Sequence, residues 1–161
     1  MKNHTSITQI ILRLLLVTAT LILATHSASA GDQVPFKGNA KGAIVNAVPE
    51  ATGILLTVHA VGRATHLGFF FREEILHFNP AAGTINGTVI FTAANGDQLF
   101  GNVSGGFVSP TQATGTYTLT GGTGHFANAS GEADFVVTTP DGSNFTAEFE
   151  GKISYTASKK K

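Results

Sequence analysis

Apolar and polar side chains alternate along most of the chain after residue 30, which is the two-residue period of a β-strand. The clearest case is residues 144–156, where Phe145, Phe149 and Ile153 share one face while Glu148 and Glu150 share the other. No stretch of ten or more residues after residue 30 shows a convincing helical period. We therefore expect strands with one face in a core and the other in water.

Turn-forming residues divide this region into eight short extended segments. Asn95 and Gly96 form a two-residue hairpin signal, and residues 140–142 read as another turn. Short connections favour antiparallel pairing of consecutive strands, and pairing the first strand with the last removes both exposed edges. We predict an all-β fold, an eight-stranded antiparallel up-and-down barrel, with an open sandwich as the alternative. The expected strands are residues 34–45, 53–61, 64–78, 84–93, 98–108, 113–120, 130–139 and 144–156.

The third expected strand, residues 64–78, is apolar on both faces. A strand of this kind must be covered on both sides, either by a terminal segment of the same chain or by another subunit. We expect a homo-oligomer. One face carries Leu67, Phe69, Phe71 and Ile75, and the other carries Phe70, Leu76 and Phe78.

Residues 1–30 have the order of a cleavable secretory signal. Lys2 and Arg13 precede an apolar run, and small residues end at Ala30. The uninterrupted apolar run is roughly half of the ~20 residues that span a bilayer, so a membrane anchor is the weaker alternative. We expect a single barrel domain over residues 31–161, with a short basic tail at 159–161 and no stable membrane span after cleavage.

The amino-acid composition limits the cellular compartments and the binding partners that we expect for this protein. The chain has no cysteine, so an exported domain of this size must be held together by packing, which favours the bacterial periplasm or the extracellular space. Of ten Lys and Arg, two lie in residues 1–30 and three in the tail, which leaves five against all ten Asp and Glu. Such a surface repels phosphate backbones, and we expect no nucleic-acid partner.

The glycine-rich segment 120–131 has the GxGxxA spacing of a dinucleotide fingerprint at Gly122, Gly124 and Ala127. A phosphate loop needs a long helix after the turn, and only about one helical turn fits before Gly131. We therefore interpret the glycines as a tight chain reversal with Phe126 as a plug.

The same segment resembles a motif of allene oxide cyclases and plant dirigent proteins. The resemblance implies an eight-stranded antiparallel barrel, typically a trimer, with an axial pocket where an apolar substrate is cyclised or coupled. Cyclases use a polar group and bound water, and dirigent proteins use acidic residues. Residues 64–71 and 91–101 look more like small exported bacterial members of this group, whose roles are largely unassigned. The matching residues are Gly121, Gly122, Thr123, Gly124, Phe126, Ala129 and Gly131.

The candidate chemistry lies on the second and third expected strands. A two-residue turn at Gly62 and Arg63 would place His59 opposite His66 on one face. These histidines would then be candidate acids or bases if the face lined the barrel interior. The alternative is a hydrogen-bonded histidine pair at the barrel rim.

Phe70, Arg72 and Glu74 continue that face along the third expected strand. We take Glu74 as a further candidate acid or base, and Phe70 and Arg72 as candidate ligand contacts. An Arg72–Glu74 ion pair at the rim is again the alternative.

Metal and cofactor chemistry have little support in the sequence. Glu73 and His77 lie about 13 Å apart along one strand, too far to chelate one ion, and we expect neither a metal nor a cofactor. The favoured function is an exported barrel that binds a small hydrophobic ligand. The alternatives are a cyclase-like isomerase or dirigent-like enzyme, for which the cyclase pocket cysteine has no counterpart here, and a structural or adhesion module.

Overall fold

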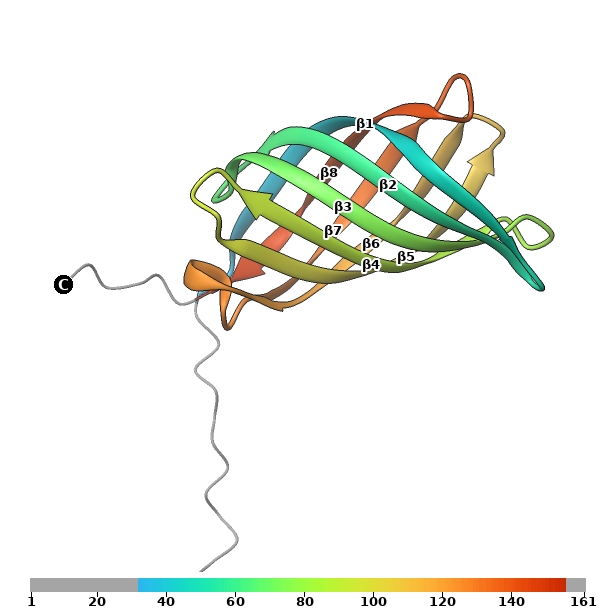
Figure 1. The fold of residues 1–161 in the computed structure, drawn as a ribbon. Helices are drawn as coiled ribbons and strands as arrows, with labels where there is room; N and C mark the ends of the chain where they lie inside the picture. The colour runs from blue at the N-terminus through green and yellow to red at the C-terminus, as the bar shows by residue number, and fades with distance from the viewer. Residues whose placement is uncertain (1–31, 156–161) are drawn as a thin grey trace, which may run out of the picture.

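The computed structural model describes residues 32–155, and it shows one closed barrel of eight antiparallel strands in sequence order (Figure 1). The predicted signal peptide and basic tail lie outside the described residues. Within them, no helix is long and apolar enough to cross a membrane. The strands are β1 (Val34–Glu50), β2 (Gly53–Ala64), β3 (Gly68–Asn79), β4 (Thr84–Ala93), β5 (Gln98–Ser109), β6 (Gln112–Gly122), β7 (Ser130–Thr138) and β8 (Asn144–Ser154).

The barrel is sealed by pairing between β1 and β8, which runs from Val34 opposite Ile153 to Ala43 opposite Asn144. This closure confirms the predicted barrel over the sandwich. Because consecutive strands run in opposite directions, the β1–β2, β3–β4, β5–β6 and β7–β8 hairpins share one end of the barrel. We call this the open end and the other the closed end.

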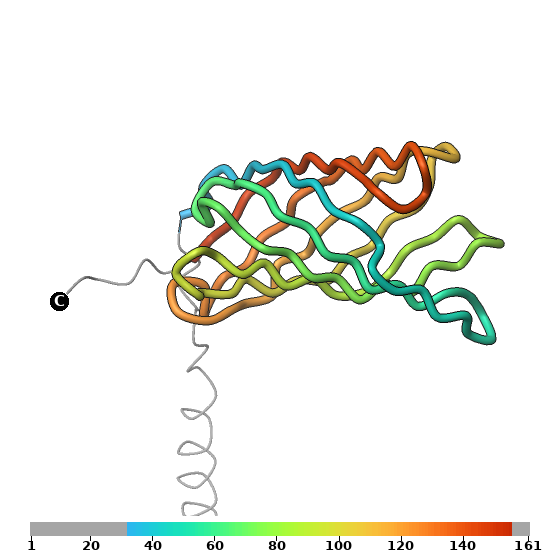
Figure 2. The backbone as a smooth tube through the Cα atoms, turned by 45° about the horizontal axis from the view of Figure 1, so that its top comes forward, coloured from blue at the N-terminus to red at the C-terminus, as the bar shows by residue number. Residues whose placement is uncertain are grey.

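The first strand is longer than predicted. It continues to Glu50, past a register shift between Ile44 and Asn46, because β2 supplies ladder partners up to Gly53. The resulting β1–β2 hairpin projects beyond the barrel beside the β3–β4 hairpin (Figure 2). We refer to residues 45–54 as the arm.

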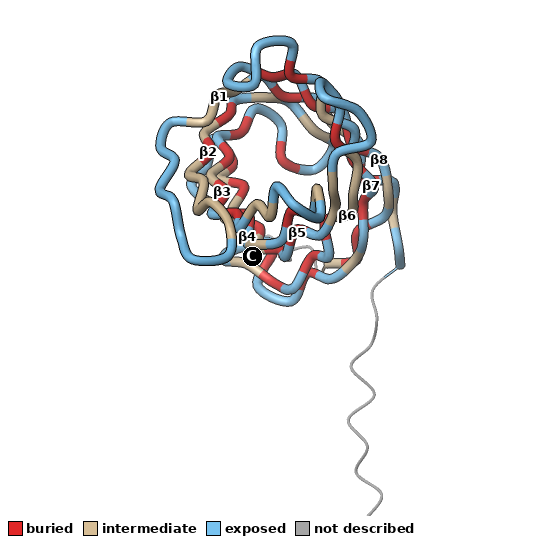
Figure 3. The backbone as a smooth tube through the Cα atoms, turned by 90° about the vertical axis from the view of Figure 1, so that its right-hand side faces the viewer, coloured by how far each residue is buried: buried red, intermediate tan, exposed pale blue. Residues whose placement is uncertain are grey.

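The closed half of the barrel is filled by aromatic rings. Phe91 is fully buried, and its ring centroid lies 5.4 Å from that of Phe70 and 5.8 Å from that of Phe149. Gly38 makes room for this packing, since a Cβ there would lie 2.4 Å from the Phe149 ring. Buried residues recur around the whole ring of strands (Figure 3), as expected for side chains that alternate between interior and solvent.

The glycine-rich loop caps the closed end. It contains only a short 3₁₀ turn, η1 (Gly124–Phe126), and Phe126 is buried as the predicted plug with its ring against Tyr155. Gly124 has a positive φ of 54°, and a Cβ there would collide with the Asp97 carboxylate. Asp97 accepts hydrogen bonds from the backbone N–H and the ring of His125, so the β4–β5 turn is fastened to the plug.

Candidate functional site

The turn between β2 and β3 differs from the prediction. Gly62 and Arg63 belong to the ladder, opposite Phe70 and Phe69, and the chain reverses at residues 65–67. The expected His59–His66 pair is therefore wrong. A three-residue loop with one residue at positive φ replaces the two-residue turn, and this residue is His66, with a φ of 67°.

The two histidines end up apart from each other and from the barrel interior. His59 lies opposite Glu73, with its Nε2 3.3 Å from the carboxylate, and both side chains are about half exposed on the outer wall. His66 Nδ1 lies 2.9 Å from the Tyr155 hydroxyl, and its Nε2 lies 3.1 Å from the Pro35 carbonyl oxygen. His66 thus anchors the turn to the neighbouring strands at the closed end.

The other candidates face the interior. Phe70 is fully buried among the rings of the closed half. Arg72 and Glu74 are 1% and 5% exposed, so they form a buried pair and not the rim pair considered as the alternative. The Arg72 Nε lies 3.6 Å from the Glu74 Oε1, which is an ion-pair distance but too long for a hydrogen bond.

Tyr117 on β6 completes the arrangement, and the sequence reasoning missed it. The Arg72 Nη1 donates to the Tyr117 hydroxyl at 2.7 Å, and this hydroxyl donates to the Glu74 Oε1 at 3.1 Å. We call these three residues the buried polar triad. The available signal was the alternation of residues 116–119, which turns Tyr117 inward, where a phenol hydroxyl needs a partner.

The surroundings of the triad control its protonation. Burial raises the pKa of Glu74, against the opposing effects of the Arg72 charge and the Tyr117 hydrogen bond. Burial also raises the pKa of Tyr117, and the negative charge of Glu74 adds to this effect. Tyr117 is therefore a neutral phenol at physiological pH, and Glu74 holds a proton more readily than an exposed glutamate.

An apolar cavity of about 90 Å³ lies against the triad on the side of the open end. Its walls include Val58, Leu76, Val103, Ala113 and Phe135, all buried. This volume corresponds to about three water molecules at ~30 Å³ each, well below the ~300 Å³ of a small drug site. An outer hollow of about 520 Å³ lies next to the cavity beside the arm, and Ile44 and Phe107 line both. Because the cavity lies on the side of this hollow, we call this end open.

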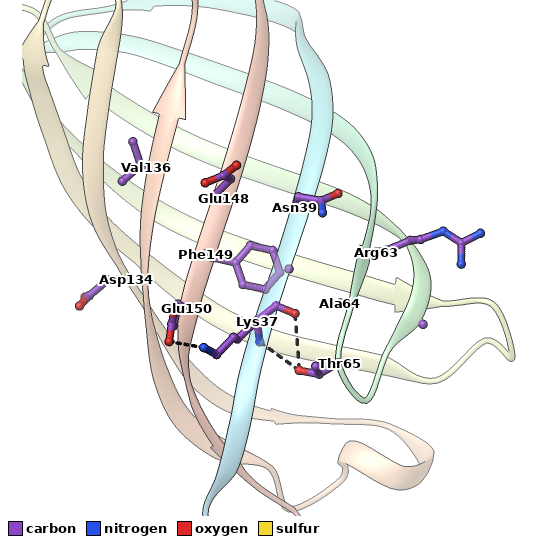
Figure 4. Close-up of a pocket in the computed structure, with 12 residues that line it drawn as sticks. Lys37, Asn39, Arg63, Ala64, Thr65, Asp134, Val136, Glu148, Phe149 and Glu150 are labelled. Carbon is purple, nitrogen blue, oxygen red and sulfur yellow. Dashed lines mark hydrogen bonds and ion pairs between the residues drawn. The ribbon is translucent and has the colours of Figure 1, made fainter.

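A larger groove of about 800 Å³ lies on the outer wall across β1, β2, β7 and β8 (Figure 4). Lys37 and Arg63 lie along it together with Asp134, Glu148 and Glu150. Lys37 and Glu150 form an ion pair, and their side chains are 55% and 69% exposed. Solvated charges of this kind do not select an apolar molecule, so the cavity and not this groove is the candidate site for one.

The closed end gathers a second polar cluster, in a cleft between the β4–β5 turn and the plug. His66, Asp97, His125 and Tyr155 line it. His66 bonds to Tyr155 and His125 bonds to Asp97, so these side chains hold loops together. Over residues 32–155 no group of three or more His, Cys, Asp or Glu side chains is placed to hold a metal ion.

Comparisons with known proteins identify the fold. No family model matches the chain, and no curated protein matches its sequence. Among solved structures, the pterocarpan synthase dirigent protein GePTS1 is similar, with a TM-score of 0.59 over 78% of this chain and 89% of that one. The sequence identity is 14%. The chain therefore has a dirigent-like barrel fold, and a likeness at this identity speaks to the fold alone.

Proposed function

We propose that this chain is an exported dirigent-like barrel that binds a small, mostly apolar molecule through its open end. The observation that carries the proposal is the pairing of an apolar cavity with a buried polar triad at its floor. Ligand pockets typically have this composition, in which apolar walls supply affinity and a few fixed polar groups supply orientation. The signal-like residues 1–30 support export.

Uptake of a hydrophobic fluorophore tests this proposal. We expect the protein without residues 1–30 to bind the fluorophore with one-to-one stoichiometry. Ala113→Leu fills the cavity from its wall, so it should weaken uptake at least tenfold while the thermal melt is retained. Ala43→Leu makes the same change on the outer face of β1 and should leave uptake unchanged. Absence of uptake by the unsubstituted protein would reject the proposal in favour of a purely structural barrel.

A cyclase-like or dirigent-like reaction on the bound molecule is the second candidate function. It is favoured by a carboxyl group whose pKa is raised by burial and which lies beside an apolar cavity, because such a group can act as a general acid. Mass spectrometry of a bound molecule before and after incubation separates the two functions. If Glu74→Gln keeps binding but stops conversion, the protein is an enzyme. If the molecule is recovered unchanged from the unsubstituted protein, the protein is a binder.

The outer face of β2 and β3 supports the homo-oligomer predicted from the sequence. Phe69 and Phe71 are 50% and 40% exposed there, and Val61 and Ile75 extend the apolar surface. A second copy of the chain that covers this patch would remove it from water. Sedimentation should show a trimer that Phe69→Glu and Phe71→Glu together convert to a monomer. A monomeric unsubstituted protein would instead assign the patch to a different partner.

A further inference from the structure

The inner cavity and the outer hollow adjoin each other across shared lining residues, and we call the two together the funnel. Ile44, Leu56 and Phe107 line both, and so does the loop at residues 142–143. The arm supplies one wall of the outer part, and Phe78, which pairs with Ile54 at the base of the arm and whose ring lies 5.4 Å from that of Phe107, extends this wall. A ligand too large for the inner cavity of about 90 Å³ can therefore extend into the outer hollow, where the lining side chains keep its apolar surface covered.

The lining of the funnel is polar at its floor, apolar along its middle and polar again near its mouth. The buried polar triad forms the floor, and the Arg72 Nε there is the one buried side-chain nitrogen or oxygen of residues 32–155 without a hydrogen-bond partner. The other polar side chains that line the funnel, Asn46, Thr139 and Ser143, lie near its mouth. The apolar stretch between is about 13 Å long along a strand, four residues from Glu74 to Phe78.

The floor also selects against charge. Arg72 and Glu74 lie within ion-pair distance and compensate each other, and both side chains are almost fully buried. A charged group brought beside them would be buried without a counter-ion, which is costly. An uncharged ligand oxygen that accepts a hydrogen bond from the Arg72 guanidinium leaves the net charge of the site unchanged.

We infer that the ligand is an uncharged, straight-chain molecule with one terminal oxygen, such as a fatty alcohol or aldehyde, which enters the funnel oxygen first. This inference rests on the proposed function. The oxygen points toward the Arg72–Tyr117–Glu74 floor, and the chain runs outward along the arm and the Phe78–Phe107 pair. The inner cavity then holds only the oxygen-bearing end of the molecule. Its small volume is therefore compatible with a ligand whose chain is longer than the cavity.

Displacement of the bound fluorophore by four compounds of equal chain length tests the inference. The probes are n-octanol, its isomer with the hydroxyl at mid-chain, n-octanoate and n-octylammonium. We expect n-octanol to displace the fluorophore at a concentration at least tenfold below each of the others. Equal displacement by the two alcohols, or stronger displacement by either ion, would overturn the inference. In both cases the proposed function stands, because the fluorophore still binds. Lack of fluorophore uptake would instead reject both.

A double variant that removes both buried charges tests whether the buried polar triad causes the preference for n-octanol over its isomer. Arg72→Met with Glu74→Gln removes both charges together and should abolish the preference for n-octanol over its isomer. Lys37→Met with Glu150→Gln removes the exposed ion pair of the outer wall and should leave the preference intact. Should the first variant fail to fold, Tyr117→Phe deletes a single hydroxyl and is expected to reduce the preference severalfold. Retention of the full preference in a folded triad variant would overturn the inference.

Discussion

The two halves of this barrel share one strand pattern and differ in what fills them. Inward positions of the closed half carry rings, such as Phe36, Phe91 and Phe149, whereas those of the open half include smaller side chains, such as Val58 and Ala113, beside the ring of Phe135. Rings fill the space between opposite walls, and smaller aliphatic side chains leave a cavity. Side-chain size at inward positions, with no change of topology, therefore separates a stabilising half from a candidate binding half.

The largest effect should come from removing a ring in the closed half. Phe91→Ala deletes a fully buried side chain that contacts several other rings, and we expect a loss of about 3–5 kcal/mol in the free energy of unfolding. Phe107→Ala removes the same atoms from a partly exposed position at the mouth and should cost about 1 kcal/mol. Urea titration of both variants measures the difference. Equal losses would show that the two halves are packed alike.

The next effect concerns the buried charges of the open half. Arg72→Met leaves Glu74 buried without its counter-ion and should cost about 3 kcal/mol at pH 7. Acidification toward pH 5 should recover part of this loss, because Glu74 can then take up a proton. Arg63→Met on the outer wall is the control and should change stability little. A fully stable Arg72→Met protein would mean that the ion pair is not desolvated.

A smaller effect should follow from crowding at the closed end. Gly124→Ala places a side chain at positive φ and also into the Asp97 carboxylate, so Asp97 must move away from His125. Gly142→Ala has the same kind of backbone conformation, with no atom within 4 Å of the added Cβ. The backbone cost is about 1–2 kcal/mol in both. Thermal melts should show a further loss only for Gly124→Ala, and equal losses would indicate that Asp97 rearranges freely.

The smallest effect should be a difference in how Glu74, at the floor of the cavity, and Asp97, at the closed end, make the folding stability depend on pH. The pKa of Glu74 is raised above the ordinary 4.5, so the stability it contributes is complete below pH 4.5 and is lost as the pH rises through its folded-state pKa. Hydrogen bonds from His125 lower the pKa of Asp97 below 3.8, so its contribution is present above pH 3.8 and is lost as the pH falls through its folded-state pKa.

Unfolding measured from pH 3 to pH 8 tests these signs. Relative to the unsubstituted protein, Glu74→Gln should remove a fall in stability above pH 4.5, and Asp97→Asn should remove a fall at the acid end. The Asp97 effect should weaken in high salt, because that carboxylate is accessible to solvent, whereas the Glu74 effect should not. Identical pH profiles for the unsubstituted protein and both variants would contradict the assigned environments.

The barrel was predictable because alternation and turn residues are local signals. Residues 84–93 were predicted without error, and the eighth strand has the expected inward Phe145 and Phe149. The β2–β3 turn was not predictable from Gly62 and Arg63, since contacts of Thr65 and His66 with β1 and with Tyr155 decide where the chain reverses. That one shift of the turn moved His59 to the outer wall.

The candidate site was predictable only in part, for the same reason. Arg72 and Glu74 lie on one strand, so their shared face follows from alternation. Tyr117 is 43 residues further along than Glu74, and its hydrogen bond depends on closure of the barrel across several strands. The size of the cavity likewise depends on side chains from opposite walls, which no local pattern relates to one another.

The meeting of the first and last strands has a practical consequence. Val34 lies beside Ile153 at the closed end, on the side of the molecule away from the funnel mouth. A tether joined to residue 32 or residue 155 would therefore hold the barrel by its base and leave the mouth facing the surrounding solution. Protein immobilised in this way should consequently keep its funnel mouth accessible.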